Sequence, residues 1–159
     1  AAHHKDENIR FLHAMGQYGL WVPEKLREMG VDTEKASNVE IREYISDMDR
    51  CMSAADIVIC RAGASSLSEL QALGKASILI PSPNVAENHQ YHNAMALVNR
   101  GAACVIEEKE LTDEKMDGLF CSLVNDKDKR AEMEQNAKAM AVYNAKEQIA
   151  DIVISLIKR

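Results

Sequence analysis

Two serines and a glutamate follow a glycine in the segment Arg61 to Glu69, which reads RAGASSLSE. Gly63 leaves room beside the backbone, and Ser65 and Ser66 offer hydroxyl donors, so the segment could hold a phosphate. Glu69 follows after about one helical turn, where its carboxylate could accept hydrogen bonds from ribose hydroxyls. The segment therefore predicts a nucleotide phosphate site. An ordinary turn before a well-capped helix has equal weight, because the spacing matches neither the dinucleotide fingerprint nor a P-loop.

A strand and a helix are expected to position these side chains. Residues 56–60, DIVIC, form an apolar run opened by an acid, which is typical of a buried strand in a parallel sheet. The helix that follows is predicted to have a serine cap, an apolar face of Leu67, Leu70 and Leu73, and an end at Gly74. Free N–H groups and the helix dipole would make its first turn attractive to an anion.

Strand and helix patterns alternate along the chain. Such alternation predicts an α/β domain with a doubly wound, mostly parallel sheet, and a single domain over residues 1–159. The predicted strands are 8–14, 39–45, 56–60, 76–80 and 102–106. The predicted helices are 22–30, 48–54, 65–73, 88–100, 112–124, 127–141 and 145–158. Ligands bind beyond the carboxyl ends of such strands, so the site is expected at loops 15–19, 45–47, 61–66 and 81–90.

Composition excludes several classes of protein. The net charge of −6 disfavours a general nucleic-acid binder, because no basic excess neutralises phosphates. The sequence has no run of 18 apolar residues, so no membrane-spanning helix is predicted. No signal peptide is visible either, so a cytoplasmic protein is expected. The four cysteines lack CxxC spacing and are predicted to be buried thiols. His89 and His92 are three residues apart but have no third ligand, so neither a metal site nor a cofactor is expected.

Four segments together carry a family resemblance: HAMGQYG, EYISDM, ADIVICRAGASSLSELQALGKASILIP and NHQYHNAMALVNRGAA. They resemble the C-terminal half of the peptidoglycan glycosyltransferases that transfer N-acetylglucosamine to lipid I, making lipid II. The resemblance extends from about residue 8 to 158. It implies the Rossmann-like donor-binding half of a GT-B enzyme, an inverting hexosyltransferase whose donor is UDP-N-acetylglucosamine.

The resemblance also implies a set of donor-binding residues. These are Ile45 at the uracil through its backbone, Ala64, Ser65 and Ser66 at the diphosphate, Glu69 at the ribose, His89 and Gln90 at the sugar hydroxyls, and Asn93 as support for the loop. The family often has a leucine-threonine pair where this chain has Ser65 and Ser66, so hydroxyl donors are kept and bulk is lost. Arg61 is expected to shape the turn.

Two parts of the family pattern fall outside this sequence: the glycine-rich GGSxGA loop and the N-terminal domain. That domain is expected to bind lipid I and the membrane and to carry the catalytic base. The chain is therefore expected to be inactive alone, without a catalytic residue of its own. The full-length protein would be peripheral on the cytoplasmic face of the plasma membrane. An exposed apolar stripe on helix 145–158 would mark a contact with the other domain.

Two alternatives stay open at this point. One is the donor domain of a related GT-B transferase that uses another nucleotide sugar. The other is a non-catalytic module that keeps the fold and serves either to bind a nucleotide sugar or as an interaction module.

Overall fold

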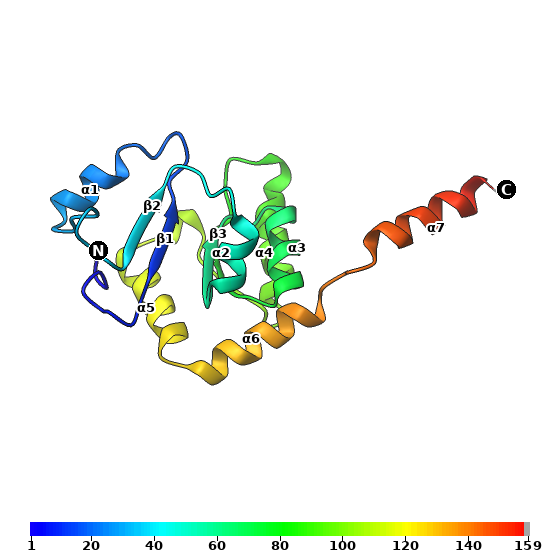
Figure 1. Ribbon diagram of the computed structural model, residues 1–159. Helices are drawn as coiled ribbons and strands as arrows, with labels where there is room; N and C mark the ends of the chain where they lie inside the picture. Colours follow the sequence, from blue (N-terminus) through cyan, green and yellow to red (C-terminus); the bar gives the residue numbers. More distant parts are fainter. Residues whose placement is uncertain (158–159) are drawn as a thin grey trace. The chain divides into compact units, whose positions relative to one another are not determined.

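The computed structural model describes residues 1–157, which form two compact units (Figure 1). The first unit is Ala1–Cys51 and the second begins at Met52. The single domain predicted from the sequence stays a prediction.

The first unit contains a two-stranded parallel sheet. Strand β1 (Phe11–Ala14) pairs with β2 (Val39–Arg42), and α1 (Val22–Glu28) lies in the connection between them. Helix α1 begins with Pro23 in its first turn and ends before Gly30, whose φ of +83° is left-handed. This connection gives the parallel pairing that a βαβ unit requires.

The pairing of the first unit continues past the strand ends. The Met15 N–H donates to the Arg42 carbonyl at 2.9 Å, and the Gly16 N–H donates to the Glu43 carbonyl at 3.0 Å. The loops that follow β1 and β2 therefore lie side by side. Helix α2 (Met48–Ala54) begins after the second of these loops.

The second unit contains a three-stranded parallel sheet. Its strands are β3 (Ile57–Cys60), β4 (Ala76–Leu79) and β5 (Cys104–Val105), in the order β3-β4-β5. Helix α3 (Ala64–Leu73) connects β3 to β4. The short helix η1 (Ala86–Asn88) and α4 (His89–Val98) connect β4 to β5. Every residue of the central strand β4 is buried, including the polar Ser77, as is typical of a parallel strand covered on both faces.

Helices complete the second unit after η2 (Glu108–Glu110). Helix α5 (Asp113–Val124) is capped by the Thr112 side chain, and α6 (Lys127–Ala139) is capped by the Asp126 side chain. Helix α6 contacts both α3 and β4, and it buries Met133 and Ala137. Helix α7 (Ala145–Ile157) buries no residue. Within residues 1–157 no helix is long and apolar enough to cross a bilayer.

The α/β class, the parallel pairing and the predicted strands and helices are confirmed, with shorter bounds for several strands. The predicted end of the last helix, residue 158, lies outside the described residues. The first two predicted strands, 8–14 and 39–45, are only four residues each, and the last, 102–106, is only Cys104–Val105. Pairing with a neighbour decides where a strand ends, and a single-sequence pattern does not contain that information.

Candidate functional site

The N-terminus of α3 is an uncapped helix end at the carboxyl end of β3. Gly63 is the N-cap, and no side chain makes a capping hydrogen bond, so the predicted serine cap is wrong. The first helical bond runs from the Leu67 N–H to the Gly63 carbonyl at 3.0 Å. In the part of the chain that the structure describes, no group accepts from the N–H of Ala64, Ser65 or Ser66. These donors remain available to an anion.

The space beside Gly63 is open. A Cβ atom added there would meet nothing nearer than the Ser66 Oγ at 4.0 Å. The φ of −70° is one that any residue adopts, so backbone conformation does not demand glycine here. The consequence of the glycine is room for a ligand to approach the backbone.

Glu69 is exposed on α3 and lies near Cys60 at the end of β3. Burial and, as the smaller cause, the negative charge of Glu69 together raise the pKa of the Cys60 thiol to about 11. Among residues 1–157 the Glu69 carboxylate has no hydrogen bond or ion pair. It therefore faces solvent, where it can accept hydrogen bonds from a ligand.

Two consecutive residues in left-handed conformation precede α4. Glu87 and Asn88 both have φ of 52°, and the helix begins at His89. Such residues typically cost about 1–3 kcal/mol each and gather at functional sites. The exposed His89 has its Nδ1 at 2.9 Å from the Ala86 carbonyl. A carbonyl only accepts, so Nδ1 donates, and Nε2 is the ring nitrogen left for a ligand.

Gln90 and Asn93 join α4 to the loops that follow β3 and β4. The Ser82 N–H donates to the Gln90 Oε1 at 2.9 Å. The Asn93 Nδ2 donates to the Ala62 carbonyl at 3.3 Å. The Gln90 oxygen is therefore engaged within the protein, and its NH₂ group is the part left for a ligand. Asn93 connects α4 directly to the turn that contains Gly63.

Arg61 makes a third link between these loops. Its guanidinium donates to the carbonyls of Ile80 and Pro81 at 3.3 and 3.4 Å, and it pairs with Glu108 at 2.5 Å. The guanidinium thus connects the end of β3 to the end of β4 by hydrogen bonds and to η2 by an ion pair. This agrees with a role in shaping the turn. The partner Glu108 is 47 residues away in the sequence, so no local pattern could have identified it.

A cavity of about 380 Å³ opens next to the loop after β4. It is lined by Pro81, Pro83, Asn88, Tyr91, Glu107, Glu108 and Lys109. None of the predicted donor-binding residues lines it. Part of the wall belongs to the predicted loop 81–90, but the remaining wall comes from α4 and from residues 107–109, which no local pattern connects to that loop.

Ile45 lies in the loop after β2, in the first unit. The residue is only 6% exposed, whereas its neighbour Tyr44 is 82% exposed. Among the described residues, the Ile45 N–H and carbonyl make no hydrogen bond. One donor and one acceptor therefore remain unpaired, as a base-recognising backbone requires. That Ile45 shares one site with the residues of α3 and α4 stays a prediction.

Comparison with known proteins decides the family. Residues 1–149 match the sequence profile described as "Glycosyltransferase family 28 C-terminal domain". The chain belongs to this family.

The chain is also similar to named transferases. The chain is 48% identical over 124 residues to the UDP-N-acetylglucosamine--N-acetylmuramyl-(pentapeptide) pyrophosphoryl-undecaprenol N-acetylglucosamine transferase of Acetivibrio thermocellus. That match covers 78% of this chain and 34% of the relative. The Desulforamulus reducens protein of the same name is 41% identical over 149 residues, with 93% and 39% covered. The chain thus spans between about a third and two fifths of these relatives.

Solved structures show the same fold. The crystal structure of MurG from Acinetobacter baumannii superposes with a TM-score of 0.77 at 29% identity, over 91% of this chain and 40% of that one. The glycosyltransferase VinC, solved in complex with DTDP, superposes with a TM-score of 0.63 at 18% identity, over 86% of this chain and 33% of that one. The second likeness concerns the fold alone.

Proposed function

We propose that this chain is the UDP-N-acetylglucosamine-binding half of a transferase that adds N-acetylglucosamine to lipid I in peptidoglycan synthesis. The observation that carries this proposal is the uncapped N-terminus of α3 with the exposed carboxylate of Glu69 on the same helix. The names of the relatives supply the sugar and the acceptor.

The diphosphate of the donor is assigned to the N–H groups of Ala64, Ser65 and Ser66. The leaving diphosphate gains negative charge as its bond to the sugar C1 breaks and the acceptor hydroxyl attacks. Fixed N–H dipoles stabilise that growing charge more than they stabilise the bound donor, which is what accelerates the reaction. Removing one such donor from a well-ordered site typically costs about 2.7–4 kcal/mol.

The other contacts to the nucleotide sugar are assigned to the polar groups of the site that remain available to a ligand. The Glu69 carboxylate takes the ribose hydroxyls, since it only accepts and hydroxyls can donate. His89 through Nε2 and Gln90 through its NH₂ group take sugar hydroxyls, one as acceptor and one as donor. Ile45 takes the uracil through its backbone. Asn93 supports the turn through its bond to the Ala62 carbonyl.

The acceptor and the membrane are assigned to parts of the protein other than this chain. The acceptor is lipid I, and the base that removes its proton belongs to the same part of the protein. The whole protein is assigned to the cytoplasmic face of the membrane as a peripheral enzyme. This chain alone is expected to bind donor without transferring the sugar.

Titration of UDP-N-acetylglucosamine by calorimetry tests the proposal. Glu69→Ala should weaken binding by about tenfold or more, because hydrogen bonds to a charged group typically contribute about 1.5–3 kcal/mol. Glu132→Ala is the matched control, because Glu132 is an exposed glutamate on another helix, α6. Equal affinity of the Glu69→Ala and Glu132→Ala variants would contradict the ribose assignment.

A thermal-shift panel of UDP-, GDP- and TDP-sugars tests the choice of donor. A ligand that binds the native state raises its melting temperature, so the largest shift should come from UDP-N-acetylglucosamine. A larger shift with another nucleotide sugar would favour a related transferase. No shift with any of them would favour an interaction module.

A further inference from the structure

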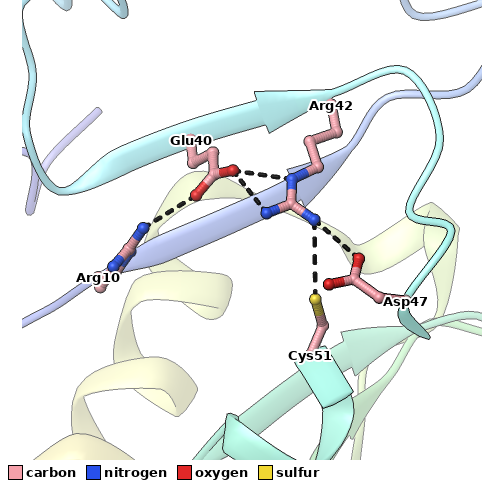
Figure 2. Close-up of polar contacts among 5 residues, drawn as sticks. All are labelled: Arg10, Glu40, Arg42, Asp47 and Cys51. Carbon is pink, nitrogen blue, oxygen red and sulfur yellow. Dashed lines mark hydrogen bonds and ion pairs between the residues drawn. The ribbon is translucent and has the colours of Figure 1, made fainter. Parts of the chain in front are cut away.

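We infer that Arg42 is a positioning residue, which fixes the loop 43–47 so that the Ile45 backbone can select uracil. Figure 2 shows the Arg42 guanidinium reaching from the end of β2 to Asp47, just before α2. Its Nη1 lies 3.0 Å from the Asp47 Oδ1. This ion pair joins the two ends of the loop that contains Ile45. The inference rests on the proposed function, because uracil is part of that proposal.

The guanidinium is held in place from its other side. Glu40 and Arg42 are two residues apart on β2 and so project from the same face of the strand. The Arg42 Nε and Nη2 both lie 2.7 Å from the Glu40 Oε1, and Arg10 donates to the other oxygen at 3.0 Å (Figure 2). Every nitrogen of the Arg42 guanidinium is therefore engaged, with the Cys51 Sγ as a weak further acceptor at 3.9 Å.

The charged groups of this network shift one another's pKa values. The Arg42 guanidinium, followed by Arg10, holds the pKa of the Glu40 carboxyl below its ordinary value. Glu40 in turn raises the pKa of Arg42. The Arg42 and Glu40 side chains are each 35% exposed, so solvent screens the pairs and their effect on global stability is small. The consequence of the network is local, namely a restrained loop.

The loop has few other restraints. The Glu43 carbonyl accepts from the Gly16 N–H, and the Ile45 side chain is buried, whereas Tyr44 and Ser46 are exposed. Uracil offers an N–H beside a carbonyl, and cytosine reverses donor and acceptor at the same edge. A backbone donor and acceptor held in one orientation therefore distinguish the two bases, and a mobile loop does so less well.

The first measurement needs no ligand. Backbone order parameters from NMR relaxation are compared in the unmodified chain, in Arg42→Met and in the matched control Arg10→Met. The control removes one bond to Glu40 but leaves the loop spanned. The amides of residues 43–47 should lose order in Arg42→Met only, from about 0.85 towards 0.6 or less. Unchanged order in Arg42→Met would overturn the restraint, whatever the chain binds.

The second measurement is base selectivity, the ratio of the Kd of CDP to that of UDP by calorimetry. Arg42→Met and Asp47→Asn should lower this ratio by about fivefold, the equivalent of one misaligned hydrogen bond, while Arg10→Met keeps it. A loosened loop with an unchanged ratio would overturn the link to base selection. An unmodified chain that binds no UDP would overturn the proposed function instead, and the order parameters would still decide whether Arg42 restrains the loop.

Discussion

At the scale of single residues, the pKa of the Cys60 thiol depends on the nearby charge of Glu69. The Cys60 thiol is half-buried at the end of β3, and the Glu69 carboxylate is the charge that adds to the effect of burial. Both causes favour the neutral thiol over the thiolate. Cys60 is therefore a probe for the position of the carboxylate that we assign to the ribose.

Cys60 should react slowly with alkylating reagents. Its pKa is raised from 9.0 to about 11, so at pH 8 the thiolate fraction falls by about 100-fold, and the thiolate is the reactive form. Glu69→Gln removes the carboxylate's contribution and should speed the reaction. Mass spectrometry of the alkylated peptide at several pH values checks both. Rapid modification of Cys60 at pH 8, or no effect of Glu69→Gln, would contradict the arrangement.

The raised pKa of Cys60 also makes the stability of the folded chain depend on pH. A thiol whose pKa is higher in the folded chain than in the unfolded chain favours folding as long as it is protonated. The Cys60 contribution is therefore complete below pH 9 and is lost as the pH rises through about 11.

At the scale of elements, α3 combines an uncapped N-terminus with exposed N–H groups. Most helices satisfy these donors with a Ser, Thr, Asp or Asn side chain, and Gly63 leaves them open. The same donors cannot serve a capping side chain and a phosphate at once. This helix end therefore gives up some stability to keep its donors free.

Gly63→Ser tests whether a capping side chain competes with the phosphate for these N–H groups. The backbone conformation, φ −70° and ψ 144°, suits an N-cap, so the new hydroxyl should cap α3 and raise stability by a few tenths of a kcal/mol. UDP affinity should fall several-fold, because the hydroxyl occupies the donors. Gly63→Asp should weaken binding further, since it adds a negative charge beside the diphosphate. Thermal denaturation and calorimetry measure the two effects.

The control for this prediction is Gly118→Ala. Gly118 lies within α5, and an added Cβ would meet nothing within 4 Å. The change should stabilise the helix by about 0.5–1 kcal/mol without altering UDP affinity. If Gly63→Ser and Gly118→Ala had the same effect on binding, the phosphate would not lie at the end of α3.

At the scale of the whole molecule, α7 carries an exposed apolar surface. No residue of the helix is buried, and its large apolar side chains are between 49% and 77% exposed. They are Ile149, Ile152, Val153, Ile154, Leu156 and Ile157. Four of them, at 149, 152, 153 and 156, have the spacing of one helical face, as the sequence predicted. The contact with another domain expected for this stripe stays a prediction.

Removing α7 should leave the rest of the chain as stable as before. A chain that ends at Asn144 keeps Tyr143, whose hydroxyl donates to the Ala72 carbonyl at 3.0 Å. Because α7 buries nothing, its loss removes no core contact, and the melting temperature should stay the same. Light scattering should show less self-association, since exposed apolar stripes promote it. A lower melting temperature would mean that α7 packs against the core.

The sequence by itself determined the kinds of elements and their order. Hydrophobic period and turn residues act over a few positions, so the buried run of β4 and the left-handed Gly74 that ends α3 could be predicted locally. The same holds for the exposed carboxylate of Glu69, which follows from its place outside the Leu67 and Leu70 face of α3. The family resemblance, confirmed by comparison, also came from contiguous motifs.

Only the tertiary structure decided which side chains meet. Asn93 bonds to the Ala62 carbonyl across 31 residues, and Arg61 reaches Glu108 across 47. The N-cap of α3 was also decided there, because the path of the chain out of β3 places Gly63, and not a serine, at the first helical carbonyl. Patterns in a sequence describe neighbours along the chain. A hydrogen bond depends on distance and direction in space, and those exist only once the strands are paired and the helices packed.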